Sequence, residues 1–488
     1  MKRLAVVWLL ALLPALRSQA GDDLSIRYAS APNAAPLHIG VSGRTISADY
    51  GTGVLAWTSV AGGTAAADAG CAGRAYVTLL REDRNGDGYI NAAAGERARL
   101  FIGASWQAGD ATHAVLIALD LSLPGIPRVL WQQSDASLPG LAVLTAAPTV
   151  ARVRIGQDNR DPQQQVLLLG AGLPRAASAT QAARTGATLY AMDAQDGRIL
   201  WSASAEAGSQ RFPAMQSAFA AGITALDVTA DGYADRLYVG DWGAALWRFD
   251  IAQGATANAL MTGGVFAQLA DPAQPSARGF LAAVDVAPVV VAGTAAWFNL
   301  SIGSAATGAG STGQALFVLR DRQPFQSLTQ AAFDALHPVQ ASELPTLTPA
   351  AAGLQGSDTA GFRIDLGSDQ VLARALTADN VLLYTQVSST TAPMGLCSTT
   401  PPTVIVKVSA VSAVDGRVAL DLNTDTQRDA ADLAHVLPAG TPPTAGVSLT
   451  AVAPGAAQTR CSVGDTVLAA CPSLPRLKRT FWRREDAD

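Results

Sequence analysis

The sequence predicts an all-β protein, and the architecture that it favours is a β-propeller of seven or eight blades. Three observations support this prediction: short apolar runs rich in β-branched residues, a weakly repeated hairpin pattern, and 45 Gly and 26 Pro spread along 488 residues. Many short strands separated by turn residues are typical of β-propellers and β-sandwiches. A pair of β-sandwiches is therefore the alternative architecture.

The predicted strands are apolar runs of five to seven residues, with turn residues between them at intervals of about ten. In chain order, the clearest are residues 165–170 (QVLLLG), 236–240 (RLYVG), 286–292 (VAPVVVA), 315–319 (ALFVL), 381–387 (VLLYTQV) and 403–408 (TVIVKV). A helical pattern is convincing only near residues 329–336, and a second candidate covers residues 430–436.

The repeat is clearest at residues 188–201, TLYAMDAQDGRILW. A strand ends in Asp, a tight turn carries Asp-Gly, and a second strand ends in Trp. Looser copies cover residues 114–131, 236–250 and 406–420. This pattern is typical of a propeller blade, in which paired antiparallel strands place an aromatic side chain between neighbouring blades. At about 40–50 residues a blade, residues 99–475 would hold seven or eight blades.

Composition and charge exclude several classes of protein. The chain is 49% hydrophobic and 15% charged, which is too apolar for a disordered protein. Its net charge of −5 argues against a nucleic-acid-binding protein. Lysine occurs only at Lys2, Lys407 and Lys478, and neither of the last two follows glycine. The chain therefore has no phosphate-binding P-loop and no plausible Schiff-base lysine in its middle.

Residues 1–20 are predicted to be a signal peptide. Lys2 and Arg3 precede an apolar run over residues 4–16, and small residues stand at Ser18 and Ala20, so we expect cleavage after Ala20. A membrane anchor is the alternative, but the run is shorter than the ~20 residues that a spanning helix needs. We expect no transmembrane segment after cleavage, since even residues 281–298 contain acidic and proline residues. The sequence therefore predicts export to the periplasm or the outer surface.

Four cysteines follow the predicted cleavage site, and an even number in an exported chain suggests two disulfides. Four cysteines allow three pairings. We favour Cys461–Cys471, which closes a short loop, and this choice leaves Cys71–Cys397 as a long-range link. Unpaired buried thiols are the alternative. No C-x-x-C motif occurs, so a redox or zinc site is not expected.

Three segments place oxygen-bearing side chains at alternate positions, as a calcium-binding loop does. Calcium takes six to eight oxygen ligands, and an EF-hand-type loop supplies them from positions 1, 3, 5, 7 (through its carbonyl) and 9, with a glycine at position 6 and a carboxylate at position 12. The candidate ligands are Asp83, Asn85, Asp87, Tyr89 and Asn91 in the first loop, Asp227, Thr229, Asp231, Tyr233 and Asp235 in the second, and Asp421, Asn423, Asp425, Gln427, Asp429 and Asp432 in the third.

The three loops depart from the full pattern in different ways. The first has Ala94 at position 12, and Glu96 stands two residues later. The second supplies three carboxylates, enough to neutralise the ion. The third has Thr426 in place of the glycine but Asp432 at position 12. An Asp-rich solvated turn is the alternative to a calcium site in each case.

Residues 225–251, ALDVTADGYADRLYVGDWGAALWRFDI, resemble a segment of the PilY/PilC family of type IV pilus biogenesis and tip-associated adhesin proteins. That family has a D-x-D-x-D-G-x-x-D calcium loop, then R-x-Y-x-G-D, then L-W-x-F-D. The matching residues are Asp227, Asp231, Gly232 and Asp235 in the loop, with Thr229 replacing its second Asp, followed by Arg236, Tyr238, Gly240, Asp241, Trp247 and Asp250.

Looser resemblances to the same family follow in its order over residues 99–488. They are residues 100–131, residues 188–201, residues 361–366 (GFRIDL), Cys397 before the last blade, and residues 480–485 (TFWRRE), which resemble a terminal S-W-R-E strand. Larger members carry a von Willebrand A-type domain ahead of the propeller, but only about 80 mature residues precede it here, without a D-x-S-x-S motif. We therefore do not expect this chain to have the functions of the von Willebrand A-type domain.

We expect residues 1–20 to be the signal peptide, 21–98 an N-terminal region that holds the first acidic loop and could form part of the first blade, and 99–488 the propeller. The resemblance implies a secreted, calcium-binding protein, not an enzyme, that acts in type IV pilus biogenesis or at the pilus tip. Implied partners are pilin and minor pilins, and a host or abiotic surface. Two alternatives stay open: a quinoprotein-like propeller dehydrogenase and a metal-free envelope scaffold.

The basic cluster at the C-terminus interleaves arginines with Phe481 and Trp482. Nucleic-acid or anionic-surface binding is one interpretation of this cluster. We favour an edge strand that closes the propeller, with its arginines in solvent.

Overall fold

The computed structural model describes most of the chain after residue 23. The described residues are 24–33, 35–42, 45–50, 55–60, 75–108, 111–125, 127–156, 165–173, 186–271, 277–289, 297–307, 311–347, 359–389, 404–451 and 459–472. The predicted signal peptide, the Cys71–Cys397 pair and the C-terminal basic cluster lie outside the described residues. No helix in the described ranges has the length and apolar character needed to cross a membrane.

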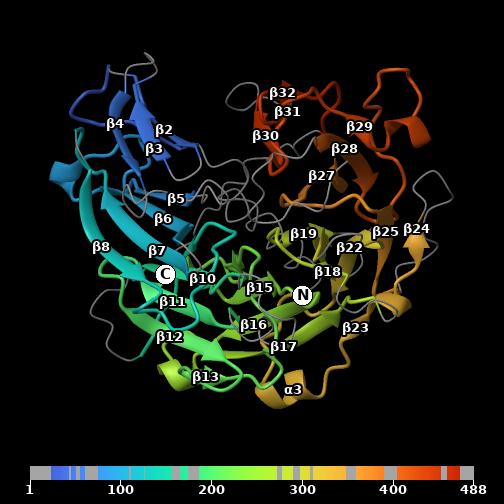
Figure 1. The fold of residues 1–488 in the computed structure, drawn as a ribbon, viewed down its shortest axis with the longest axis horizontal. Coiled ribbons are helices and arrows are strands. Elements are labelled where there is room, and N and C mark those ends of the chain that lie inside the picture. The colour runs from blue at the N-terminus through green and yellow to red at the C-terminus, as the bar shows by residue number, and fades with distance from the viewer. Residues whose placement is uncertain are drawn as a thin grey trace, which may run out of the picture.

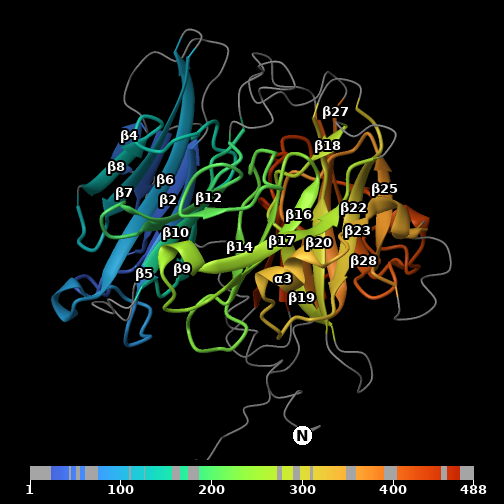
Figure 2. The same cartoon turned by 90° about the horizontal axis from the view of Figure 1, so that it is seen from below.

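The described strands form seven sheets of three to five strands and one small two-stranded ribbon; the seven larger sheets follow one another around a ring, as the colour from blue to red shows in Figure 1. This is a seven-bladed β-propeller, which confirms the predicted fold class. Each sheet is mainly an antiparallel meander of consecutive strands. Figure 2 views the ring from below, with the short helix α3 (Gln330–Asp334) near the centre of the picture; in Figure 1 the same helix lies at the lower edge of the ring.

The first three blades come from residues 25–211. Blade 1 contains β1 (Ser25–Ile26), β2 (Leu37–Ser42), β3 (Thr45–Asp49) and β4 (Leu55–Val60); blade 2 contains β5 (Ala75–Glu82), β6 (Arg97–Ala108), β7 (Ala111–Asp120) and β8 (Arg128–Ser134); blade 3 contains β9 (Thr149–Arg152), β10 (Gln165–Gly170), β11 (Leu189–Asp193), β12 (Ile199–Ser204) and β13 (Gln210–Arg211).

The remaining blades come from residues 224–467. Blade 4 contains β14 (Thr224–Leu226), β15 (Arg236–Gly240), β16 (Ala245–Ile251), β17 (Met261–Gln268) and β23 (Val339–Gln340); blade 5 contains β19 (Asp285–Val289), β20 (Trp297–Gly303), β22 (Gln314–Asp321), β25 (Gly361–Gly367) and β24 (Thr346–Leu347); blade 6 contains β26 (Leu376–Ala378), β27 (Val381–Ser389), β28 (Val404–Ser412) and β29 (His435–Val436); blade 7 contains β30 (Val447–Ala451), β31 (Thr459–Val463) and β32 (Thr466–Val467).

Short elements complete the fold. Strands β18 (Arg278–Gly279) and β21 (Ala305–Ala306) pair as a small ribbon, and single 3-10 turns are η2 (Ala92–Ala94), η3 (Ala257–Ala259), η4 (Ala341–Glu343) and η5 (Ala430–Asp432). The connection from β22 to β25 contains β23, which adds in parallel to the outer strand β17 of blade 4. This connection therefore ties blade 5 to blade 4.

The helix prediction near residues 329–336 is confirmed by α3, whose N-cap Thr329 accepts a hydrogen bond from the N–H of Ala332. The second helical candidate, residues 430–436, is wrong. Only the 3-10 turn η5 forms there, because Ala434 adopts a left-handed φ of 57° and His435 then pairs with Val408 in the sheet of blade 6.

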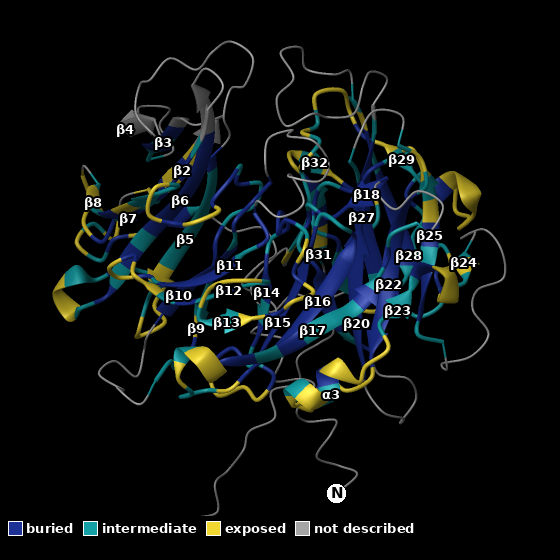
Figure 3. Cartoon of the chain, turned by 60° about the horizontal axis from the view of Figure 1, so that its bottom comes forward, coloured by how far each residue is buried: buried dark blue, intermediate teal, exposed yellow. Residues whose placement is uncertain are grey.

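The hydrophobic core lies between neighbouring sheets, where the buried strands form the inner part of the ring in Figure 3. Trp201, on the outer strand of blade 3, is 1% exposed and packs in one cluster with Phe249 of blade 4. Trp131, at the corresponding place in blade 2, packs in a cluster with Tyr190 of blade 3. The repeated aromatic residue thus packs between blades, as the hairpin pattern predicted.

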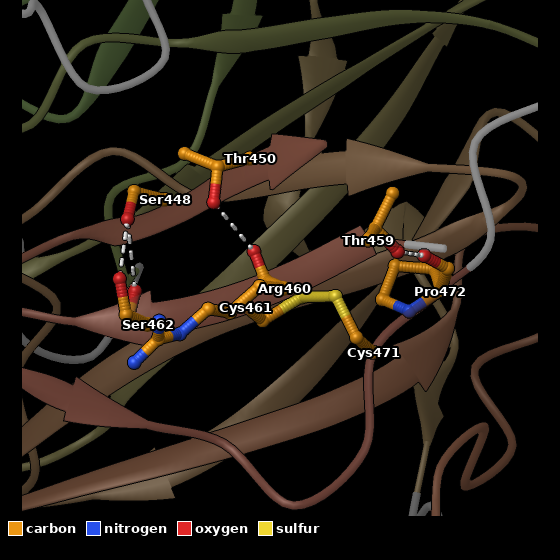
Figure 4. The surroundings of a disulfide bond; sticks show 8 residues. All are labelled: Ser448, Thr450, Thr459, Arg460, Cys461, Ser462, Cys471 and Pro472. Carbon is orange, nitrogen blue, oxygen red and sulfur yellow. Dashed lines mark hydrogen bonds between the residues drawn. A yellow bond between two sulfur atoms is a disulfide. The ribbon is translucent and has the colours of Figure 1, made fainter. Parts of the chain in front are cut away.

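The predicted disulfide Cys461–Cys471 is confirmed, with an S–S distance of 2.07 Å (Figure 4). Cys461 lies on β31, and Thr459 at the start of the same strand donates a hydrogen bond to the carbonyl of Pro472. The bond therefore holds the end of the described chain against blade 7. A structural disulfide fits an oxidising compartment, periplasmic or extracellular.

Candidate metal-binding loops

The three acidic loops open on one face of the propeller. The blade-2 loop (residues 83–96) joins β5 to β6, the blade-4 loop (residues 227–235) joins β14 to β15, and the blade-6 loop (residues 421–432) joins β28 to β29. Strand direction alternates within each meander, so connections after the first and the third strand of a blade leave on the same side. Sequence positions far apart are thereby brought to a common surface.

The backbone follows the same course in all three loops. Positions 4 and 6 adopt left-handed φ angles in each: Gly86 and Gly88, Ala230 and Gly232, and Thr424 and Thr426, with φ between 59° and 89°. Glycine at position 6 makes this conformation easy, whereas a β-branched residue rarely adopts it. The blade-6 loop takes the same turn without glycine, so its side-chain hydrogen bonds must hold it there.

The Asp at position 1 organises each turn by accepting backbone hydrogen bonds. Asp83 Oδ2 accepts from the N–H of Gly88 at 2.7 Å, Asp227 Oδ2 from Gly232 at 2.7 Å, and Asp421 Oδ2 from Thr426 at 2.8 Å. The Asp at position 5 accepts from the N–H of position 7 in every loop; the donors are Tyr89, Tyr233 and Gln427. Because a carboxylate oxygen has two lone pairs, each retains capacity for a cation.

A further carboxylate closes each loop against the N–H groups of positions 2 and 3. In the blade-4 loop this is Asp235, which accepts from Val228 at 2.7 Å and from Thr229 at 2.8 Å. In the blade-6 loop it is Asp432, which is fully buried and accepts from Leu422 at 2.8 Å. Position 12 of the blade-6 loop therefore closes the loop through backbone hydrogen bonds, and its role as a calcium ligand stays a prediction.

In the blade-2 loop the closing carboxylate is Glu96, which the spacing rule did not place among the candidate ligands. Glu96 is 2% exposed and accepts from the N–H groups of Arg84, Asn85 and Asn91. The turn η2 takes up the additional residues between Asn91 and Glu96. The available sequence clue was its position, because Glu96 is an acidic residue that stands only two residues after position 12 of the loop.

The predicted ligands at position 9 divide into two groups. Asn91 and Asp429 act as N-caps, because their side chains accept hydrogen bonds from the N–H groups of Ala94 and Ala431. Asp235 instead closes its own loop. Among the described residues, no three Asp, Glu, His or Cys side chains gather around one point. The carboxylates of Asp227, Asp231 and Asp235, which the sequence predicts to share one ion, are therefore not gathered around one point. Each loop also contains amide or hydroxyl and carbonyl oxygens, and calcium accepts ligands of these types.

Electrostatics favour a cation at the blade-4 loop. Burial raises the pKa of Asp227 above its ordinary value, and the nearby charge of Asp235 raises it further, against hydrogen bonds from Gly232 and Asp231 that lower it. A cation beside these two carboxylates would oppose the raised pKa of Asp227, since an opposite charge favours the ionised form. Hard oxygen donors of this kind suit calcium.

The residues that follow the blade-4 loop form a buried ionic cluster rather than a site. Arg236 Nε donates to Asp250 Oδ1 at 2.6 Å, and Arg248 Nη1 lies 3.0 Å from Asp321 Oδ2. All four side chains are 5% exposed or less, and the hydroxyl of Tyr238 also donates to Asp321. The cluster joins blade 4 to Asp321 at the end of a strand of blade 5.

Asp241 and Trp247 have a structural role as well. Asp241 accepts hydrogen bonds from the indole Nε1 of Trp247 at 2.9 Å and from the N–H groups of Gly243 and Ala245. The tight turn between β15 and β16 is thereby fixed. The motif that carries the family resemblance therefore consists of one acidic loop followed by residues that build the blade.

These features define a class: a seven-bladed propeller with three acidic turns on one face. No family model and no curated protein sequence matches the chain. Among solved structures, the chain is similar to the C-terminal domain of Pseudomonas aeruginosa PilY1, with a TM-score of 0.61 and 15% identity over 90% of this chain and 93% of that one. The fold expected from the PilY/PilC resemblance is confirmed by this likeness.

Two other solved structures are more distant. They are the Malassezia sympodialis allergen Mala s 1, with a TM-score of 0.29 and 10% identity over 80% of this chain and 86% of that one, and Saccharomyces cerevisiae Sqt1, with a TM-score of 0.33 and 7% identity over 82% of this chain and 97% of that one.

Proposed function

We propose that this protein is an exported, calcium-binding β-propeller that acts in the assembly of type IV pili or at the pilus tip. The observation that carries the proposal is the likeness to the PilY1 C-terminal domain along nearly the whole chain. The PilY/PilC-type motif supports it, because its residues occupy a loop and the blade that follows it in one continuous unit.

Calcium would act as a crosslink within the loops. In the blade-4 loop, the residues that would hold the ion are Asp227, Thr229, Asp231, Asp235 and the carbonyl of Tyr233. An ion bound there would join both ends of a turn that hydrogen bonds alone now close. We propose the same role for the blade-2 and blade-6 loops, whose backbones follow the same path.

The proposed mechanism is binding, without catalysis. Three loops on one face would be ordered by calcium together, so that this face presents a defined surface to pilin or minor pilins, or to a host or abiotic surface, only when it is loaded. The propeller supplies a rigid support for these loops, as scaffolds with functional loops generally do.

The test compares pilus assembly in a strain that lacks the gene and is complemented with the wild type, Asp231→Ala or Asp196→Ala. Asp196 is an exposed turn residue of blade 3 and serves as the matched control. We expect wild type and Asp196→Ala to restore surface pili and twitching motility, and Asp231→Ala to fail at equal protein levels. Full restoration by Asp231→Ala would contradict the calcium mechanism, and normal piliation in the deletion strain would contradict the pilus function.

A further inference from the structure

Two arginines of blade 3 lie beside the blade-4 loop. Arg152 ends the inner strand β9 and Arg154 follows two residues later. Val153 between them is fully buried, whereas Arg152 is exposed and Arg154 is half-buried. This alternation places both guanidinium groups on the outer side of the extended segment.

Arg154 contacts the middle of the loop, and the side chain of Arg152 lies beside it. The guanidinium carbon of Arg154 lies 3.7 Å from the centroid of the Tyr233 ring, a cation–π contact. A Cβ placed on Gly232 would lie 3.8 Å from Nη1 of Arg152. The backbone fixes this arrangement, because the N–H of Ala234 donates to the carbonyl of Arg152 at 2.9 Å.

These positive charges are not paired with the acidic loop. Within the described parts of the chain, neither guanidinium forms an ion pair with a carboxylate of the loop, and the loop carboxylates accept backbone N–H groups instead. The loop carries three carboxylates, although these do not gather around one point, and an added calcium ion would bring two further positive charges to a loop that already has two guanidinium groups beside it. The local charge would become positive, and a group of opposite charge would be needed to balance it.

Calcium would also keep room for an external ligand. It takes six to eight oxygens, and the loop offers five ligand positions. The tip is open, since Ala230, Asp231 and Gly232 are exposed. An exposed tip suits a side chain presented by a protein surface, whereas small ligands such as sugars favour concave sites.

We propose that the blade-4 loop, Arg152 and Arg154 form one composite site for a carboxylate side chain of a protein partner. One carboxylate oxygen completes the calcium coordination, and the guanidinium groups, which match carboxylates in geometry, bind the rest. The inference rests on the proposed calcium binding. Until the partner binds, the positive charges of the two arginines weaken calcium binding. Calcium and the partner therefore each strengthen the binding of the other.

The first test is a calorimetric calcium titration of the full chain as wild type, Arg152→Gln/Arg154→Gln and Arg460→Gln. Arg460 is an exposed arginine on β31 in blade 7, and its replacement controls for the removal of a positive charge away from the blade-4 loop. Without partner, the double variant should bind calcium at the blade-4 loop about three- to tenfold more tightly than the wild type. Equal affinities in the double variant and the Arg460 control would overturn the inference while leaving the proposed function intact. No calcium binding by the wild type would contradict both.

The second test measures fluorescence polarisation of a labelled, capped peptide with four glutamates and of its all-glutamine counterpart. The wild type should bind the glutamate peptide at least tenfold more tightly with calcium than without, and the double variant should lose this gain. Arg152→Gln alone keeps the Tyr233 contact and should show a partial loss. Equal binding of both peptides, or competition by sialyllactose at lower concentration than by the glutamate peptide, would overturn the assignment of a protein carboxylate.

Discussion

Asp321→Ala is expected to destabilise the protein by about 3–5 kcal/mol, because it removes one partner of a buried ionic cluster. Asp321 is 1% exposed and accepts from Arg248 Nη1 at 3.2 and 3.0 Å, from the N–H of Gln323 at 2.8 Å, and from the Tyr238 hydroxyl. Two arginines are neutralised by two aspartates in this cluster, so the alanine variant keeps one uncompensated buried positive charge. A loss of this size is a large part of the ~5–15 kcal/mol of a typical domain.

The assay is guanidinium denaturation followed by tryptophan fluorescence. Asp196→Ala is the control, because Asp196 is 58% exposed and its Arg198 partner lies at 3.9 Å, so less than about 1 kcal/mol is expected. Asp321→Asn, which retains an acceptor but not the charge, should fall between the two. Equal stability of Asp321→Ala and Asp196→Ala would refute the assignment of the cluster as a blade-to-blade support.

Three further predictions concern stability. Trp201→Ala should lower the free energy of unfolding, measured by denaturation, by about 3–5 kcal/mol. Ile199→Ala on the same strand should lower it by less than about 1.5 kcal/mol, because Ile199 is 37% exposed, and similar losses in both variants would contradict the role of Trp201 between blades. Replacing Cys461 and Cys471 with serine should lower the free energy of unfolding by about 2–3 kcal/mol, as expected for a disulfide that closes a loop of ten residues. An unchanged thermal midpoint would contradict a stabilising role of this disulfide. Burial raises the pKa of Asp241 to about 6, so the folded state holds a proton that the unfolded chain releases near pH 4. Stability should therefore fall by about 1.4 kcal/mol per pH unit between about pH 4 and 6, relative to Asp241→Asn, and parallel pH profiles would contradict the shift.

The blades could be predicted because their structure is local. Residues 188–201 pair β11 with β12 through a short turn, and turn residues and alternating burial specify such hairpins. The parallel addition of β23 to β17 could not be predicted, because it joins segments about 70 residues apart without a local pattern. The failed helix at residues 430–436 has a similar cause, since pairing of His435 with Val408 prevailed over helix propensity.

The acidic loops were predictable in composition but only partly in detail. Spacing identified the organising residues Asp83, Asp227 and Asp421, because a tight turn needs its acceptors at fixed offsets. It did not identify Glu96 as the closing carboxylate, since the intervening turn η2 changes the offset. Nor could it identify Arg152 beside Gly232, because that contact depends on the packing of two neighbouring blades.

The most direct test of the central claim is a calcium titration of the purified full chain by calorimetry, comparing wild type with Asp231→Ala. We expect the wild type to bind calcium and Asp231→Ala to lose the binding at the blade-4 loop, because Asp231 supplies the carboxylate at position 5 and accepts a hydrogen bond from the N–H of Tyr233. Titration curves that are the same for both proteins, or a wild type that binds no calcium, would contradict the claim.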